Sequence, residues 1–184
     1  MRSRMGLLLP VIAFLLAVAA SAADLPPAPE GFTWKKIDSV QAAFLMPQGW
    51  HFLEAEKEGT RAFFITKEDI DKTGQYETGL SVNVQKLKKD PAPQKAAETI
   101  AGLMSVGEIQ DFFQTDNGVL KTYGCRVRRT DPAHAPLIIQ WLAIGNSRTN
   151  TIYLISFESP ESSWKEAWGK GEVILKDFRL DDGI

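Results

Sequence analysis

Two neighbouring segments near the C-terminus, 137–144 and 151–157, are apolar at adjacent positions as well as at alternate ones. A strand with one face in water alternates polar and apolar side chains, so a strand that is apolar on both faces has to be covered on both. The two segments are connected through residues 145–148. They are therefore predicted to form a hairpin in the middle of a sheet, between two covering layers.

Two amphipathic segments predict these layers. The first opens at Asp90-Pro91, because the first turn of a helix tolerates a proline whose missing N–H has no partner there. Its apolar face comprises Ala96, Ile100, Leu103 and Met104. We expect this helix to end at Gly107.

The second helical segment has Ser159 as its expected N-cap and Pro160 at its first helical position. Its apolar residues recur every three or four positions: Trp164, Ala167, Trp168, Gly171, Ile174 and Leu175. Gly169 and Gly171 each lower helix stability by about 1 kcal/mol relative to alanine. Packing against the sheet therefore has to stabilise this helix.

The remaining predicted strands are shorter. They cover residues 33–37, 42–46, 50–56, 61–66, 79–87, 110–115, 119–129 and 178–180. Residues 67–78 are polar and are predicted to form a loop, whereas Asn117-Gly118 predicts a tight hairpin turn. This order of strands and helices predicts an α+β fold, an α/β/α sandwich with a central, mainly antiparallel sheet flanked by helices.

Two motifs are similar to those of a known family. Phe44-Leu45-Met46-Pro47-Gln48-Gly49-Trp50 resembles the F-x-x-P-x-G-W opening of the PsbP-like superfamily, named for an extrinsic subunit of photosystem II. The closing segment, Tyr153-Leu154-Ile155-Ser156-Phe157 followed by Pro160, Trp164 and residues 173–178, resembles the last strand and helix of that family. Asp177 stands where the family often has serine.

The resemblance covers residues 33–181. It implies an antiparallel sheet with helices on both sides, in an accessory, assembly or binding protein. It implies no catalytic motif, and the photosynthetic role does not follow from a shared fold.

The N-terminus is typical of an export signal. Arg2 and Arg4 precede an apolar run of about 15 residues, shorter than the roughly 20 that a membrane-spanning helix needs. Small residues at Ala20 and Ala22 predict cleavage after Ala22, with Ala23 as the alternative. A retained membrane anchor is the rival interpretation.

We therefore expect a signal peptide over residues 1–22, a Pro-rich mobile tail over 23–32 and one domain over 33–181. The expected location is the bacterial periplasm or the medium, with no membrane span after cleavage. The whole chain has a formal net charge of −2, and loss of the two N-terminal arginines makes the mature domain more acidic. Non-specific binding of nucleic acid needs a basic surface, so nucleic acid is not an expected partner.

Cys125 is the lone cysteine, which excludes an internal disulfide. Its expected role is that of a small buried residue, although a reactive thiol is the alternative. Cys125 on a strand and His134 in the following loop could form a thiol–imidazole pair. Neither His51 nor His134 has metal-ligand spacing, and no cofactor motif is present, so we expect no metal or cofactor.

Arg126 and Arg128 share one face of their predicted strand. They could receive an acidic partner or a lipid headgroup, but charges on a solvated edge strand are the favoured interpretation. Trp50 and His51 follow the Pro-Gln-Gly turn. Trp50 could line a groove, although core or rim packing is favoured, and His51 is expected to be exposed or structural.

These observations favour an exported, non-catalytic accessory or binding module whose partner is an envelope protein or a small ligand. One alternative is a small envelope enzyme, a hydrolase or a thiol-dependent enzyme, that uses Cys125 and His134. The other is a binder of anionic lipid or membrane surfaces that uses Arg126 and Arg128.

Overall fold

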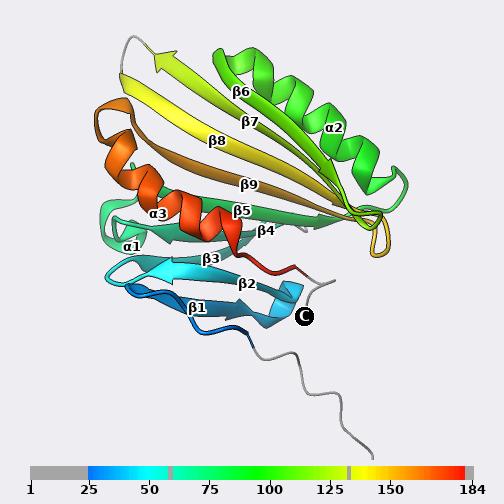
Figure 1. Cartoon of the computed structure of the whole chain (residues 1–184), viewed down its shortest axis with the longest axis horizontal. Helices are drawn as coiled ribbons and strands as arrows, with labels where there is room; N and C mark the ends of the chain where they lie inside the picture. The colour runs from blue at the N-terminus through cyan, green and yellow to red at the C-terminus, as the bar shows by residue number, and fades with distance from the viewer. Residues whose placement is uncertain (1–24, 58–59, 132–133, 181–184) are drawn as a thin grey trace, which may run out of the picture.

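The computed structural model describes residues 25–57, 60–131 and 134–180. Its strands are β1 (Phe32–Ile37), β2 (Ala42–Pro47), β3 (His51–Lys57), β4 (Thr60–Thr66), β5 (Gly79–Lys86), β6 (Glu108–Asp116), β7 (Leu120–Asp131), β8 (His134–Asn146) and β9 (Thr151–Pro160). An antiparallel seven-stranded sheet has the order β3-β4-β5-β9-β8-β7-β6, and β1 pairs with β2 in a separate sheet (Figure 1). The predicted signal peptide lies outside the described residues.

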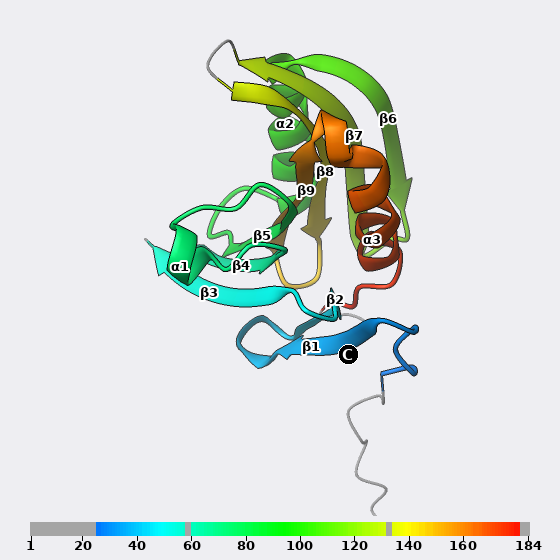
Figure 2. The same ribbon diagram turned by 90° about the vertical axis from the view of Figure 1, so that its left-hand side faces the viewer.

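The two doubly apolar segments are central, as predicted. They form the β8–β9 hairpin, and β9 is the middle strand of the sheet. The helix α2 (Ala92–Leu103) packs on β7, β8 and β9, whereas α3 (Trp164–Lys176) lies on the opposite face against β9 and β2 (Figure 2). Neighbouring residues of β8 consequently enter different cores, Ala143 beneath α2 and Leu142 on the α3 side. The predicted α/β/α arrangement is confirmed.

The first two strands form a small sheet of their own, which the sequence did not predict. The strand predicted at 178–180 is reduced to a single bridge, in which the backbones of Ala43 and Arg179 exchange hydrogen bonds of 2.9 and 2.8 Å. Beside this bridge the rings of Phe44 and Phe178 stack, with centroids 5.8 Å apart. The chain after α3 therefore fastens the small sheet to the body of the domain.

Helix α3 begins later than predicted. A 3-10 turn over Glu161–Ser163 precedes it, so Ser163 rather than Ser159 stands at the N-cap of the helix that begins at Trp164. Ser159 stays in β9, where it is fully buried and its hydroxyl lies 2.9 Å from that of Ser163. The buried position of Ser159 in the sheet outweighed its local capping preference.

Close packing accounts for one of the two glycines of α3. A Cβ atom at Gly171 would lie 2.7 Å from the ring of Phe157, whereas a Cβ at Gly169 would meet nothing within 4 Å. Only glycine lets α3 approach β9 this closely at position 171. Packing of this kind is what the helix needs to offset its glycines.

The segment predicted as a loop contains one helical turn, α1 (Ile70–Thr73). The two ends of the segment over 67–78 lie together, because the Lys67 N–H donates to the carbonyl of Thr78 at 2.9 Å. The Glu68 carboxylate also accepts hydrogen bonds from the amides of Glu77 and Thr78, both at 3.1 Å. These contacts fix where Lys67 and Thr78 lie relative to the sheet.

Candidate functional site

The most exposed large apolar side chains of the described residues gather on β6 and on the turn before it. They are Val106, Ile109, Phe112 and Phe113, with exposed fractions of 46, 47, 46 and 40%. All nine residues of β6 are exposed, and β6 is an outer strand of the sheet, paired with β7. We call these four residues the β6 patch. An edge strand that carries an apolar patch is typical of an interaction surface.

A groove adjoins the β6 patch, between β6 and α3. It encloses about 1010 Å³, including its open side. Its apolar lining comprises Phe113, Leu142, Trp168, Leu175 and Phe178. The Phe113 ring lies directly on Gly124 of β7, where a Cβ atom would come within 2.3 Å of it. The groove thus continues the β6 patch toward the helix.

Arg126 forms part of this groove. Its guanidinium carbon lies 4.5 Å from the ring centroid of Trp168 and 5.4 Å from that of Trp164. Its Nε donates a hydrogen bond of 3.2 Å to Gln140 Oε1. Arg126 therefore acts as a cation on an aromatic surface, a contact worth about 0.5–2 kcal/mol.

Arg128 also faces the α3 side and is held by an acid. Its Nε and NH2 donate to the two carboxylate oxygens of Glu161, both at 2.8 Å. This pairing raises the pKa of Arg128 and lowers the pKa of Glu161. Both arginines of the lipid-binding alternative are therefore engaged within the domain, and their strand β7 is not the edge strand that the favoured interpretation assumed.

The structure separates Cys125 from His134. Cys125 is fully buried beneath α2, and burial raises the pKa of its thiol to about 11. His134 pairs with Asp131 at the far end of the β7–β8 hairpin. Cys125 and Asp131 stand six positions apart along β7, about 20 Å at the rise of an extended chain. The hypothetical thiol–imidazole pair is not brought together.

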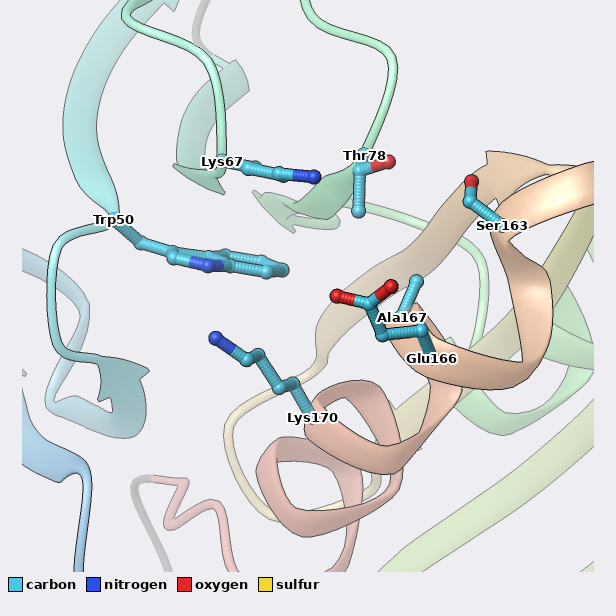
Figure 3. Close-up of a pocket in the computed structure, with 7 residues that line it drawn as sticks. All are labelled: Trp50, Lys67, Thr78, Ser163, Glu166, Ala167 and Lys170. Carbon is cyan, nitrogen blue, oxygen red and sulfur yellow. The ribbon is translucent and has the colours of Figure 1, made fainter.

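Trp50 lies at the junction of the two sheets, where it lines a cleft of about 350 Å³ including its open side (Figure 3). Its indole is 9% exposed and stacks on Phe157, with an interplanar angle of 12°. The other lining residues are Lys67, Thr78, Ser163, Glu166, Ala167 and Lys170. The Lys170 Nζ lies 5.6 Å from the indole centroid. Trp50 thus belongs to the core and also lines a cleft.

His51 points elsewhere. Its side chain is 45% exposed, and its Nδ1 lies 3.9 Å from the carboxylate of Asp69. The same carboxylate accepts a closer contact of 2.8 Å from Lys72. This hydrogen bond with Lys72 lowers the pKa of Asp69. In the part of the chain that the structure describes, no group of three or more His, Cys, Asp or Glu side chains could hold a metal ion.

A third pocket, of about 1040 Å³ including its open side, lies beside the loop over 67–78. Its lining includes Tyr76, Arg129 and Glu158. Burial raises the pKa of Glu158, and the hydrogen bond from Tyr76 and the charge of Arg129 offset only part of this shift. This half-buried acid could not be singled out from the sequence, because Glu158 looks like an ordinary polar position at the end of a strand.

Comparison with known proteins supports the fold. No family model and no curated protein matches the sequence. The cyanobacterial PsbP of Synechocystis matches with a TM-score of 0.52 and 12% identity, over 88% of this chain and 98% of that one. The fold is PsbP-like. The Ran-binding protein Mog1p of Saccharomyces cerevisiae also matches, with a TM-score of 0.50 and 11% identity over 81% of this chain and 95% of that one.

The PsbP-like fold brings together the two motifs on which the resemblance was based. Phe44 of the opening motif stacks on Phe178 of the closing segment. Trp50, the last residue of the opening motif, stacks on Phe157. The two motifs are far apart in sequence, but their aromatic side chains pack together in the core.

No helix among the described residues has the length and apolar character required to cross a membrane.

Proposed function

We propose that this chain is an exported, non-catalytic accessory module that binds a partner protein through the β6 patch. One observation carries the proposal: the most exposed large apolar residues of the described chain gather on one outer strand and the turn before it. Exposed apolar surface costs about 25 cal/mol per Å² relative to burial, so an outer strand with several exposed apolar side chains favours a cover. The groove beside Trp168 extends the surface that a partner would contact.

The non-catalytic part of the proposal rests on the state of the candidate nucleophile. A thiol acts as a nucleophile in its thiolate form, and reactive cysteines are exposed and have a lowered pKa. Cys125 is fully buried, and its thiol pKa is raised to about 11. This environment supports a structural cysteine.

Export is supported by the sequence pattern of the first 22 residues. Expression of the whole chain in a bacterium, followed by fractionation and intact-mass measurement, tests it. We expect a periplasmic or secreted product cleaved after Ala22, with Ala23 as the alternative end. An uncleaved chain in the membrane fraction would support the retained anchor instead.

The protein-binding role also agrees with one structural neighbour. Mog1p is described as a Ran-binding protein, so a chain with this fold serves protein binding in yeast. Ran itself is not inferred as a partner here, because a shared fold does not transfer a binding site.

Site-specific photo-crosslinking in the native envelope tests the proposal. A photoreactive phenylalanine analogue replaces Phe112 in one variant and Leu53, on the opposite edge strand β3, in a matched control. We expect a defined adduct from position 112 and none from position 53. The captured protein is then purified, and its affinity for the wild type is compared with that for a Phe112→Ser/Phe113→Ser variant. Equal affinity, or equal adducts from both edges, would remove β6 as the binding surface.

A further inference from the structure

The outer edge of β6 offers a defined set of backbone groups. The Asn117 N–H donates to the carbonyl of Leu120 at 3.2 Å, which closes the β6–β7 turn as a hydrogen-bonded pair. Hydrogen-bonded and non-bonded pairs alternate along an antiparallel ladder. Phe112 is paired with Cys125, five steps from the turn, and therefore belongs to a non-bonded pair. Its amide points away from β7, toward the position of an added strand.

This outward amide is already occupied by a side chain. The Phe112 N–H donates to Asp111 Oδ1 at 2.8 Å. Asp111 stands beside an irregularity in the ladder, where the register shifts between Ile109 and Asp111. The carboxylate thus caps a donor that an incoming strand would need. Bulges and charged side chains of this kind protect edge strands from unwanted pairing.

The negative charge of β6 favours some added strands over others. The strand has the sequence EIQDFFQTD, with three carboxylates and no basic side chain. Asp116 has a cationic neighbour, Lys121, at 3.9 Å. Arg126 is the register partner of Asp111 on β7, but its guanidinium lies over Trp168, and no cation of the described residues lies within 4.0 Å of the Asp111 carboxylate. Two copies of β6 paired edge to edge would bring like charges together, which is destabilising. A basic segment would bring opposite charges together instead.

We infer, on the basis of the proposed function, that the partner adds an extended segment along β6 and carries a lysine or arginine that pairs with Asp111. The cation draws the carboxylate away from the Phe112 amide, and this N–H then donates to a carbonyl of the partner. An apolar side chain of the same segment enters the groove between β6 and α3, beside Phe113 and Trp168. Asp111 thus makes strand addition at β6 depend on a positive charge in the partner.

Matched peptides serve as probes, because the partner is unidentified. Each is a capped nine-residue peptide that alternates valine and threonine, with either lysine, norleucine or glutamate at its centre. The mature protein is titrated with each peptide, and the amide resonance of Phe112 is followed by NMR. We expect the lysine peptide to bind about fivefold or more tightly than the glutamate peptide, in line with the coupling of one partly screened charge pair. This preference should weaken as the salt concentration rises.

Two substitutions at position 111 separate charge from capping. Asp111→Asn keeps an oxygen that can cap the amide but removes the charge, so it should abolish the preference for lysine. Asp111→Ala removes both, so it should bind the norleucine peptide more tightly than the wild type does. Asp111 is exposed, and both variants are expected to fold.

Several results would overturn the inference. They are equal binding of the lysine and glutamate peptides, no effect of Asp111→Asn, no binding of any peptide, and a wild-type dimer through β6 in sedimentation experiments. If position 112 still captures a protein in the crosslinking experiment, the proposed function stands and only the strand-addition inference fails. If neither experiment gives a signal at β6, both fail.

Discussion

The indole of Trp50 lies within 12° of parallel to the ring of Phe157, with the ring centroids 6.4 Å apart. Phe157 in turn contacts Trp164 and Trp168 at centroid distances of 6.0 Å. Arg126 lies over the far tryptophans, and Lys170 lies over Trp50. One aromatic cluster therefore connects the cleft at the sheet junction with the groove beside β6.

Replacement of Trp50 by alanine should destabilise the domain by about 3–5 kcal/mol, the usual cost of removing a large buried aromatic side chain. Urea denaturation of the mature domain measures this change. Trp34→Ala is the control, because Trp34 is only half-buried in the small sheet, and a smaller loss is expected there. Equal losses for the two variants would show that the Trp50 stack has no special role.

The buried thiol predicts a pH dependence of stability. The folded pKa of Cys125 is about 11 because of burial, above the value of about 8.5 for an unfolded thiol. The folded state thus holds its proton over a range in which the unfolded state loses it. The free energy of unfolding should therefore fall as pH rises from about 9 to 11, by up to about 3 kcal/mol. Below this range the contribution is fully present.

Comparison with Cys125→Ala isolates this effect, since other groups titrate in the same range. The difference in pH slope between the wild type and the variant is the quantity to measure. We also expect a thiol reagent at pH 8 to label the wild type only after denaturation. Rapid labelling of the folded protein would contradict the buried-thiol assignment and revive the thiol-enzyme alternative.

Glu158 predicts a second pH dependence of stability, in the acidic to neutral range. Burial raises the pKa of its carboxyl, so the folded state prefers the protonated form. The contribution of Glu158 to stability is present below its unfolded pKa and is lost as pH rises through the folded value. Glu158→Gln should therefore be more stable than the wild type at pH 7 and should lose this dependence.

Thermal unfolding at several pH values measures the effect of Glu158→Gln. Glu77→Gln, at an exposed position of the same pocket, is the matched control and should leave the profile unchanged. A wild-type profile that is retained in Glu158→Gln would show that the acid is well solvated.

The two glycines of α3 predict substitutions of opposite sign. Gly169→Ala has open space and should stabilise the domain by about 0.5–1 kcal/mol through helix propensity. Gly171→Ala places a methyl group 2.7 Å from the Phe157 ring and should destabilise the domain by about 1–3 kcal/mol. Chemical denaturation of the two variants under identical conditions measures both changes. If both substitutions changed the stability in the same direction, α3 would not pack closely on β9 at position 171.

Local patterns predicted most of the fold. The doubly apolar segments of β8 and β9 indicated central strands, and the helical stripe from Trp164 to Leu175 indicated α3. Both patterns report which faces are buried, and burial is the main constraint on periodicity. The predicted start of α3 was wrong. Ser159 has a good local preference for an N-cap, but it is buried in strand β9.

The candidate surface was harder to predict. The adjacent pair Phe112-Phe113 between acids was a visible signal, since neighbouring residues of a strand point to opposite faces and neither is polar. Period alone does not distinguish a central strand from an outer one, however. The charged pair Arg126 and Arg128 is the more conspicuous sequence feature, yet Trp168 contacts the first side chain and Glu161 binds the second.

The sequence by itself predicted most of the elements and the double covering of β8 and β9, because these depend on patterns within short segments, and the export signal stays a prediction of the same kind. Only the tertiary structure decided that β6 is an outer strand, that Cys125 lies far from His134 and that Trp50 meets Phe157. Each of these depends on strand order and on contacts between residues distant in sequence. Such contacts follow from how the whole chain packs, and no local pattern records them.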